Sequence, residues 1–238
     1  SPGIDFSKCK LSKYLKQNYS KVYTDLDVFY SFFGNDSVTI TGTNGKSTTA
    51  KLLYDVLKDQ KKDARLVGNI GNPILSEKKI IKKTFFVIEA SSYQLEYSKI
   101  FKSKYSVILN ITPDHIERHK NFKNYIKAKF RLLDSQTTQS VAFIKRNDPV
   151  IIKKLRSKKY KQKIIKIDTS PQPRILKKIR NKYFMSSGNR ENLIFVLKIC
   201  QILCVNNKKL LRTINKFKGL KYRQQIIFDN NYLTIIND

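Results

Sequence analysis

The sequence predicts an α/β protein in which a mostly parallel sheet is covered by helices on both faces. Three observations favour this fold. Short β-branched segments alternate with amphipathic helical ones, the apolar segments read as buried strands, and polar motifs follow these strands. The 238 residues can build one large domain with its own core, and 40% hydrophobic residues are typical of a globular protein.

The predicted strands and helices follow one another in a regular order. A first strand at residues 38–41 leads through a glycine-containing turn into a helix that ends near residue 57. Further strands are expected at 64–67, 85–88, 105–109, 141–144 and 163–167, and further helices at 122–133 and 189–205. Apolar side chains of the 122–133 segment recur on one helical face. Because ligands of such folds bind at the carboxyl ends of the strands, the loops there are where a site is expected.

The two ends of the chain differ from this core. Residues 1–24 precede the first core helix, and from residue 217 the pattern changes to a hairpin-like pair of strands. The chain starts without Met and stops directly after an apolar strand, which favours a fragment of a longer protein. We therefore expect three segments: the tail of one domain at 1–24, a central domain at 25–216 and the start of another domain at 217–238.

The strong positive charge of the chain does not by itself indicate a nucleic-acid partner. Lys and Arg number 48 against 18 Asp and Glu, a net charge of +30. A nucleic-acid surface concentrates basic residues with aromatic ones or within a reading module. Here the lysines are scattered among Ile, Asn, Tyr and Phe, the residue types that AT-rich codons favour. We expect no nucleic acid as partner, although a positive field still favours encounters with anionic nucleotides.

Composition also bears on location. No run of about 18 apolar residues is free of charge, so no membrane span is expected. The N-terminus has no basic region followed by an apolar stretch and is not a secretory signal. Cys9, Cys200 and Cys204 lack the spacing of a disulfide framework and are expected to be free and mostly buried. These features predict a cytoplasmic protein.

A glycine-rich turn joins the first strand to the helix that follows it. Glycine lets the backbone wrap closely around phosphate oxygens, and the N–H groups at a helix start stabilise negative charge. The Lys46 ammonium can reach outer phosphates, and the hydroxyl of Ser47 or Thr48 can bind Mg²⁺. The alternative is an ordinary strand-to-helix turn with an exposed lysine. The residues predicted to bind nucleotide here are Gly42, Thr43, Asn44, Gly45, Lys46, Ser47 and Thr48.

Glu89 lies at the exit of the strand expected at 85–88. A carboxylate at this position faces the nucleotide cleft, where Mg²⁺ needs oxygen ligands. The alternative is a helix N-cap region, because Ser91 or Ser92 can cap a following helix. Glu89 is therefore a candidate metal ligand.

The two histidines of the chain follow the strand expected at 105–109. His115 comes at the carboxyl end of that strand, and His119 is expected on the side nearer the surface. A histidine in a loop is usually structural or solvated, and Lys129 by itself reads as one more lysine on a solvated helix face. These residues alone do not define a metal site.

Three motifs resemble those of the Mur ligases. Thr-Gly-Thr-Asn-Gly-Lys-Ser-Thr at 41–48 is similar to the ATP loop of this family and of its relative folylpolyglutamate synthase. Glu-Ala-Ser-Ser-Tyr-Gln-Leu at 89–95 resembles the D-glutamate-adding Mur ligases in particular, and Asn-Ile-Thr-Pro-Asp-His-Ile-Glu-Arg-His at 110–119 resembles the second metal segment of the family. The resemblance implies a central Mur ligase domain containing a phosphate loop. It makes residues 1–24 the tail of a UDP-binding domain and 217–238 the start of a truncated C-terminal domain.

The resemblance also implies roles for single residues. The implied Mg²⁺ ligands are Ser47, Glu89, His115 and carbamylated Lys129, and the implied catalytic residues are Lys46, His115 and Lys129. Substrate contacts are implied for Asn69, Ser91 and Ser92. ATP contacts are implied for the phosphate loop, Asn189, Asn192, Arg223 and Asp238. Carbamylation is chemically reasonable, because carbon dioxide adds to a neutral amine and burial near cations lowers the pKa of a lysine. Three positions depart from the family pattern: Gly188 and Tyr222 replace His, and Gln225 replaces Glu.

The reaction that the resemblance implies is ATP-dependent ligation in peptidoglycan synthesis. The carboxylate of UDP-N-acetylmuramoyl-L-alanine would attack the γ-phosphate of ATP, and the amine of D-glutamate would displace the resulting acyl phosphate, with Mg²⁺ as cofactor. The protein is expected to be a monomer, and this chain alone to bind ATP but to ligate poorly. Two alternatives stay open: another ligase of the superfamily, such as folylpolyglutamate synthase, and a non-catalytic basic protein that binds nucleic acid.

Overall fold

The computed structural model describes residues 8–170, 174–220, 225–230 and 232–237. The strands are β1 (Ser37–Thr41), β2 (Ala64–Gly68), β3 (Phe85–Glu89), β4 (Tyr105–Ile108), β5 (Val141–Lys145), β6 (Lys163–Ile167), β7 (Gln225–Asp229) and β8 (Thr234–Asn237). The α-helices are α1 (Ser12–Gln17), α2 (Asp25–Phe32), α3 (Lys46–Asp59), α4 (Ser92–Tyr97), α5 (Ile116–His119), α6 (Phe122–Asp134), α7 (Pro149–Arg156), α8 (Ser187–Ile202) and α9 (Asn207–Lys216). Short 3₁₀ helices are η1 (Tyr19–Lys21), η2 (Ile74–Ser76), η3 (Arg174–Lys178) and η4 (Lys182–Phe184).

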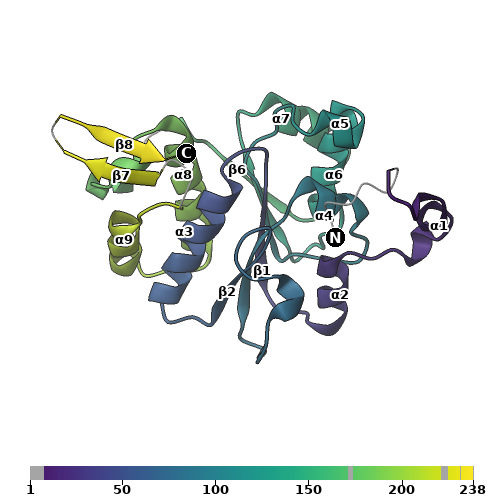
Figure 1. Cartoon of the computed structure of the whole chain (residues 1–238). Helices are drawn as coiled ribbons and strands as arrows, with labels where there is room; N and C mark the ends of the chain where they lie inside the picture. The colour runs from purple at the N-terminus through teal and green to yellow at the C-terminus, as the bar shows by residue number, and fades with distance from the viewer. Residues whose placement is uncertain (1–7, 171–173, 221–224, 231, 238) are drawn as a thin grey trace.

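Six strands form one parallel sheet in the order β2-β3-β1-β4-β5-β6 (Figure 1). After β1 the chain forms the edge strand β2, and then β3 between β2 and β1. It next crosses to the other side of β1 to form β4. The loops that follow β1 and β4 therefore lie next to each other at the carboxyl ends of the strands. This is the topological switch point at which open α/β sheets bind their ligands. The predicted fold class is confirmed.

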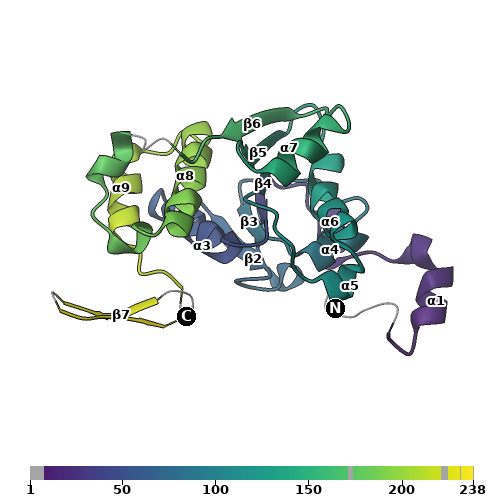
Figure 2. The same cartoon turned by 90° about the horizontal axis from the view of Figure 1, so that it is seen from above.

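Two hydrophobic cores lie on opposite faces of the sheet, and the strand residues alternate between them. Val87 and Val107 pack in the core beneath α3 and α8, whereas their neighbours Ile88 and Ile108 pack in the core beneath α2 and α6. Viewed from above, α3, α8 and α9 lie on one side of the sheet and α4, α6 and α7 on the other (Figure 2). This alternation is what a sheet buried on both faces requires.

The expected 189–205 helix is shifted: α8 begins at Ser187 and ends at Ile202. Cys204 adopts a left-handed conformation with φ 51°, and the N–H of Val205 donates to the carbonyl of Cys200 at 3.0 Å. Such a backward bond ends a helix. The prediction of mostly buried thiols is wrong, because Cys200 is buried but Cys9 is half-buried and Cys204 is exposed. None of the three forms a disulfide within the part of the chain that the structure describes.

The hairpin-like pair of strands at the C-terminal end is present as a separate two-stranded antiparallel sheet of β7 and β8. In Figure 1 it lies beyond α8, away from the six-stranded sheet. Within the described parts of the chain, no helix is both long enough and apolar enough to span a bilayer.

Asp27 anchors α2 to the loop that leads into β4. Its side chain is fully buried and accepts hydrogen bonds from the backbone N–H groups of Lys99, Ile100 and Phe101, each at 2.9 Å. Further bonds come from the Ser98 hydroxyl and from the backbone and side chain of Thr24. Burial alone would raise the pKa of this carboxyl, but the backbone bonds outweigh it and hold the pKa below its ordinary value.

Candidate active site

The glycine-rich turn forms a phosphate-loop geometry between β1 and α3. Gly45 has φ 83°, a left-handed conformation, and immediately precedes the first turn of α3. A Cβ atom built at Gly45 would lie 2.1 Å from Oδ1 of Asn192, so a larger residue would displace that amide as well as strain a left-handed backbone. The N–H groups of the first turn of a fourteen-residue helix are thereby directed at the loop, an arrangement suited to an anion.

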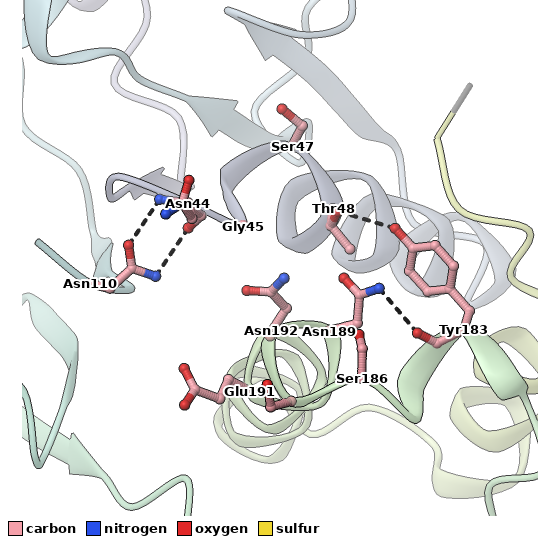
Figure 3. A pocket seen from close by; sticks show the side chains of 12 residues that line it. Asn44, Gly45, Ser47, Thr48, Asn110, Tyr183, Ser186, Asn189, Glu191 and Asn192 are labelled. Carbon is pink, nitrogen blue, oxygen red and sulfur yellow. Dashed lines mark hydrogen bonds between the residues drawn. The ribbon is translucent and has the colours of Figure 1, made fainter. Parts of the chain in front are cut away.

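Asn110, which follows β4, clamps the loop from the neighbouring strand. Its Oδ1 accepts a hydrogen bond from the N–H of Thr43 at 3.2 Å. The same Oδ1 accepts from the N–H of Asn44 at 2.8 Å, and Nδ2 donates to the Asn44 carbonyl at 3.2 Å (Figure 3). Asp148 supports the segment after β4 that carries Asn110, because its carboxylate accepts a hydrogen bond from the N–H of Ile111 at 3.0 Å. Sequence reasoning did not assign a role to Asn110 by itself, because the signal is the adjacency of β1 and β4 and not a local pattern.

Replacing Asn110 with alanine should weaken nucleotide binding about 5- to 10-fold, because the loop loses the three hydrogen bonds that hold its backbone. Titration calorimetry with ADP measures this. Asn35→Ala is the matched control, since the Asn35 amide also donates to carbonyls, those of Ile81 and Thr84, but far from the loop. Equal ADP affinity in the Asn110 and Asn35 variants would contradict the prediction.

A cavity of about 450 Å³ opens between the phosphate loop and the start of α8. It is lined by Asn44, Gly45, Ser47, Thr48, Asn110, Tyr183, Ser186, Ser187, Gly188, Asn189, Glu191 and Asn192. The Asn189 amide donates to the Tyr183 carbonyl at 3.1 Å, and the Tyr183 hydroxyl lies 3.4 Å from that of Thr48 (Figure 3). Asn189 and Asn192 thus lie opposite the loop. At Gly188 an added Cβ would meet no atom within 4 Å.

A second cavity, of about 340 Å³, lies on the other side of the loop. It is lined by Thr43, Asn44, Gly45, Lys46, Ser47, Asn69, Glu89, Ser91, Ser92, Tyr93, His115, Tyr125 and Lys129. It shares Asn44, Gly45 and Ser47 with the first cavity, so the two adjoin across the loop. Lys46, Glu89 and His115, which come from three separate strand ends, face one common space.

Glu89 presents a buried carboxylate to this second cavity. Its Oε1 accepts a hydrogen bond from the Asn69 amide at 3.0 Å. Its Oε2 is buried and has no hydrogen-bond partner among the residues that the structure describes. A buried carboxylate oxygen without a partner is costly unless a cation or a proton completes it. The oxygen of Glu89 therefore fits a divalent cation, and the hydroxyl of Ser47 lies on the same cavity.

Lys129, in α6, is buried and not solvated: the residue is only 1% exposed. Its Nζ donates to the Gly42 carbonyl at 2.7 Å and lies 4.5 Å from the centre of the Tyr125 ring. Burial first, and then the nearby charge of Lys46, lowers the pKa of Lys129 to about 7. Lys46 itself folds back on the loop, donating to the carbonyls of Gly42 at 3.1 Å and Thr43 at 2.7 Å.

Of the two histidines, His115 lines the second cavity and His119 is buried. His119 is 2% exposed, so its predicted place on the surface side is wrong. The short helix α5 turns its ring inward, where Nε2 lies 2.9 Å from the Ser92 hydroxyl. Burial, with the charge of Arg118 next, lowers the pKa of His119 to about 4. His115 is exposed with φ 52°, and its ring lies 5.2 Å from that of Tyr93.

Some residues that were predicted to contact ATP, and some that depart from the family pattern, lie outside the residues that the structure describes. Arg223, Asp238 and the departing Tyr222 fall outside the described residues, as does the side chain of Gln225. In the described ranges, no group of three or more His, Cys, Asp or Glu side chains could hold a metal ion. A cation bound here would rely on Glu89 together with hydroxyl, imidazole or water ligands.

These features define a parallel α/β domain with a phosphate loop at its switch point. The model of the Mur ligase middle domain matches residues 40–203, and the chain belongs to the Mur ligase family. It is 32% identical, over 263 aligned positions, to a UDP-N-acetylmuramoylalanine–D-glutamate ligase of Rickettsia bellii (strain RML369-C), covering 100% of this chain and 57% of that protein. A ligase of the same name from Elusimicrobium minutum (strain Pei191) is also 32% identical, with the same shares covered. The chain thus spans little more than half the length of these relatives.

Solved structures agree on the fold. The MurF ligase of Thermotoga maritima in complex with ADP superposes with a TM-score of 0.66 over 93% of this chain and 56% of that one, at 15% identity. A UDP-N-acetylmuramoyl-L-alanyl-D-glutamate–2,6-diaminopimelate ligase superposes with a TM-score of 0.61 over 92% of this chain and 51% of that one, at 22% identity. At these identities the likeness shows the fold alone.

Proposed function

We propose that this chain is the ATP-binding core of a ligase that joins D-glutamate to UDP-N-acetylmuramoyl-L-alanine. The observation that carries the proposal is the second cavity, on which the loop lysine Lys46, the carboxylate of Glu89 and the imidazole of His115 meet. The printed names of the relatives from Rickettsia and Elusimicrobium supply the substrates. Residues 25–216 would form the nucleotide-binding unit, with 1–24 and 217–238 belonging to neighbouring domains.

The first cavity would hold the nucleoside part of ATP and the second its outer phosphates with the acceptor carboxylate. Asn189 and Asn192 would contact the base, and the loop N–H groups and Lys46 the phosphates. Asn69, Ser91 and Ser92 would contact the muramoyl substrate from the far wall. Arg223 and Asp238 would complete the ATP contacts.

Mg²⁺ would be held by Glu89, Ser47, His115 and Lys129, the last as its carbamate. When bound, such a cation offsets negative charge between the reactants. That charge is a real barrier, because two unit charges about 4 Å apart repel by about 4 kcal/mol at an effective dielectric near 20. Since about 1.4 kcal/mol is a tenfold change in rate, offsetting this repulsion through Lys46 and the metal ligands is worth orders of magnitude.

The first test is nucleotide binding by the chain itself. Lys46→Ala should weaken Mg²⁺-ATP binding about 10- to 100-fold, because it removes a charge-assisted contact to phosphate. Lys51→Ala on the same helix is the control, since Lys51 is ion-paired with Asp55 at 2.6 Å, outside both cavities. Calorimetry reports the affinities. A chain that bound no ATP, or the same loss in both variants, would refute an ATP site.

The second test separates the acceptor substrates. Phosphate release from ATP should depend on UDP-N-acetylmuramoyl-L-alanine together with D-glutamate, and not on a folate with L-glutamate. Dependence on the folate would assign the site to a folylpolyglutamate synthase instead. Binding to DNA with a steep salt dependence, indifferent to ATP, would favour a nucleic-acid-binding protein.

A further inference from the structure

Ser92, which lines the second cavity, forms a buried pair with His119, which does not line it. Ser92 is 3% exposed and His119 2%, and their Oγ and Nε2 atoms lie 2.9 Å apart. The imidazole contacts two aromatic rings: it stacks on Tyr93 with ring centres 5.5 Å apart and meets Tyr125 edge-on with ring centres 5.3 Å apart. The backbone behind it is held as well, because the Asn124 amide donates to the His119 carbonyl at 2.9 Å. The ring is therefore fixed in one orientation.

The surroundings of the other ring nitrogen, Nδ1, bear on which of the two residues donates the Ser92–His119 hydrogen bond. Nδ1 of His119 lies 3.8 Å from Oε2 of Glu96, too far for an ordinary hydrogen bond but close enough for electrostatic influence. A carboxylate only accepts, so a proton on Nδ1 faces it favourably, whereas a lone pair on Nδ1 would be repelled. The Glu96 carboxylate thus favours the neutral tautomer that carries its proton on Nδ1, although Arg118 Nη1 also approaches the same oxygen at 3.6 Å. In this tautomer Nε2 accepts the hydroxyl proton of Ser92.

We propose that His119 is a positioning residue, which directs the Ser92 hydroxyl proton away from the second cavity so that Ser92 offers oxygen lone pairs to it. Lone pairs repel a bare carboxylate or phosphate oxygen and attract a hydrogen-bond donor. Because the Glu89 carboxylate oxygen that has no hydrogen-bond partner in the described ranges lies on the same cavity, the donor that fits is a water molecule of a bound divalent cation. The identity of this donor rests on the proposed function, whereas the direction of the hydroxyl does not.

A pair of substitutions separates positioning from packing. His119→Gln places an amide near the site of Nε2, within reach of Ser92, whereas His119→Asn places it near Nδ1 and loses Ser92. The probe is Mn²⁺, titrated by electron paramagnetic resonance into each folded protein saturated with ADP. His119→Asn and Ser92→Ala should weaken Mn²⁺ binding about 5- to 10-fold, while His119→Gln stays within about twofold of wild type. ADP affinity without metal should be equal in all of them.

Equal Mn²⁺ affinity in a folded His119→Asn protein would overturn the role of the pair in the cavity. A loss of the same size in the Gln and Asn variants would assign His119 to packing alone. Both results leave the ATP site itself standing, so they are distinct from failure of the proposed function.

Nitrogen-15 NMR tests the hydroxyl direction independently of any ligand, and only two histidines contribute to the spectrum. At pH 7, His119 should show a protonated Nδ1 and an unprotonated Nε2, and Ser92→Ala should shift the Nε2 signal of His119 but not that of His115. The opposite tautomer, or an unchanged Nε2 signal, would overturn the inference. Wild-type protein that binds neither ADP nor Mn²⁺ would refute the proposed function, and the NMR result would still decide the inference.

Discussion

Lys129→Met should raise the free energy of unfolding at pH 7 by about 3 kcal/mol. Burial lowers the pKa of the Lys129 amine from its ordinary value of 10.5 to about 7. At about 1.4 kcal/mol per pKa unit, this shift lowers the stability of the folded protein at pH 7 by roughly 4–5 kcal/mol. The hydrogen bond to the Gly42 carbonyl contributes about 1–1.5 kcal/mol in return. That carbonyl keeps a donor in the variant, because Lys46 also bonds to it. Methionine fills the space without a charge, so stability rises where a functional group is lost.

The pH dependence of this effect has a definite sign. Between pH 7 and 10.5 the unfolded chain holds a proton on Lys129 that the folded chain has released, so wild-type stability rises with pH in this window. Lys129→Met lacks that slope, and its advantage shrinks as the pH rises. Urea unfolding at pH 7, 8 and 9 measures both. Lys127→Met, at an exposed position of the same helix, is the control and should behave as wild type.

The same variant tests the proposed carbamate. Wild-type protein in ¹³C-bicarbonate should show a carbamate carbon signal that Lys129→Met lacks and Lys127→Met retains. If the unfolding free energy of Lys129→Met rose with pH as steeply as that of wild type, the Lys129 amine would not have a lowered pKa. If none of the three proteins showed the carbamate signal, Lys129 would be removed from the proposed metal ligands.

Asp27→Asn should lower the free energy of unfolding by about 3–5 kcal/mol, a loss in the range of a broken buried hydrogen-bond network around a charged group. The carboxylate accepts from three consecutive N–H groups, at Lys99, Ile100 and Phe101, and from Thr24. An asparagine keeps one acceptor oxygen and turns an NH₂ group toward donors that then lack a partner. Chemical unfolding at pH 7 measures the loss.

Asp25→Asn is the control for this substitution, because Asp25 lies in the same first turn of α2 but is only half-buried. It should cost no more than about 1 kcal/mol. Since the pKa of Asp27 is lowered, its contribution is present above the ordinary value of 3.8 and is lost as the pH falls through the lower folded value. The gap between wild type and Asp27→Asn should therefore close in acid; a gap independent of pH would contradict the role of the charge.

The strands were predictable because their signal is local. Each apolar run lies within a residue or two of the strand found, since a sheet buried on both faces needs continuous apolar segments. The phosphate loop was predictable for the same reason: its glycines and Lys46 are consecutive in the chain.

Burial of single polar side chains was not predictable, because it depends on distant segments. Lys129 is one of 48 basic residues, and apart from the family resemblance nothing in its local pattern marks it as the one beneath the Gly42 carbonyl. His119 reads as a surface residue until α4 supplies Ser92 as its partner. Asn110 became a clamp only once β4 was placed beside β1.

The open edge at β6 gives the abundant lysines a physical consequence. Among the described residues β6 is the end strand of the six-stranded sheet and pairs with β5, so its outer edge has no strand partner there. Lys163 and Lys166 are exposed along it. Ammonium groups on an unpaired strand oppose edge-to-edge association of two copies, and salt weakens that opposition by screening. A residue bias that codon usage can produce thus also protects this sheet against aggregation.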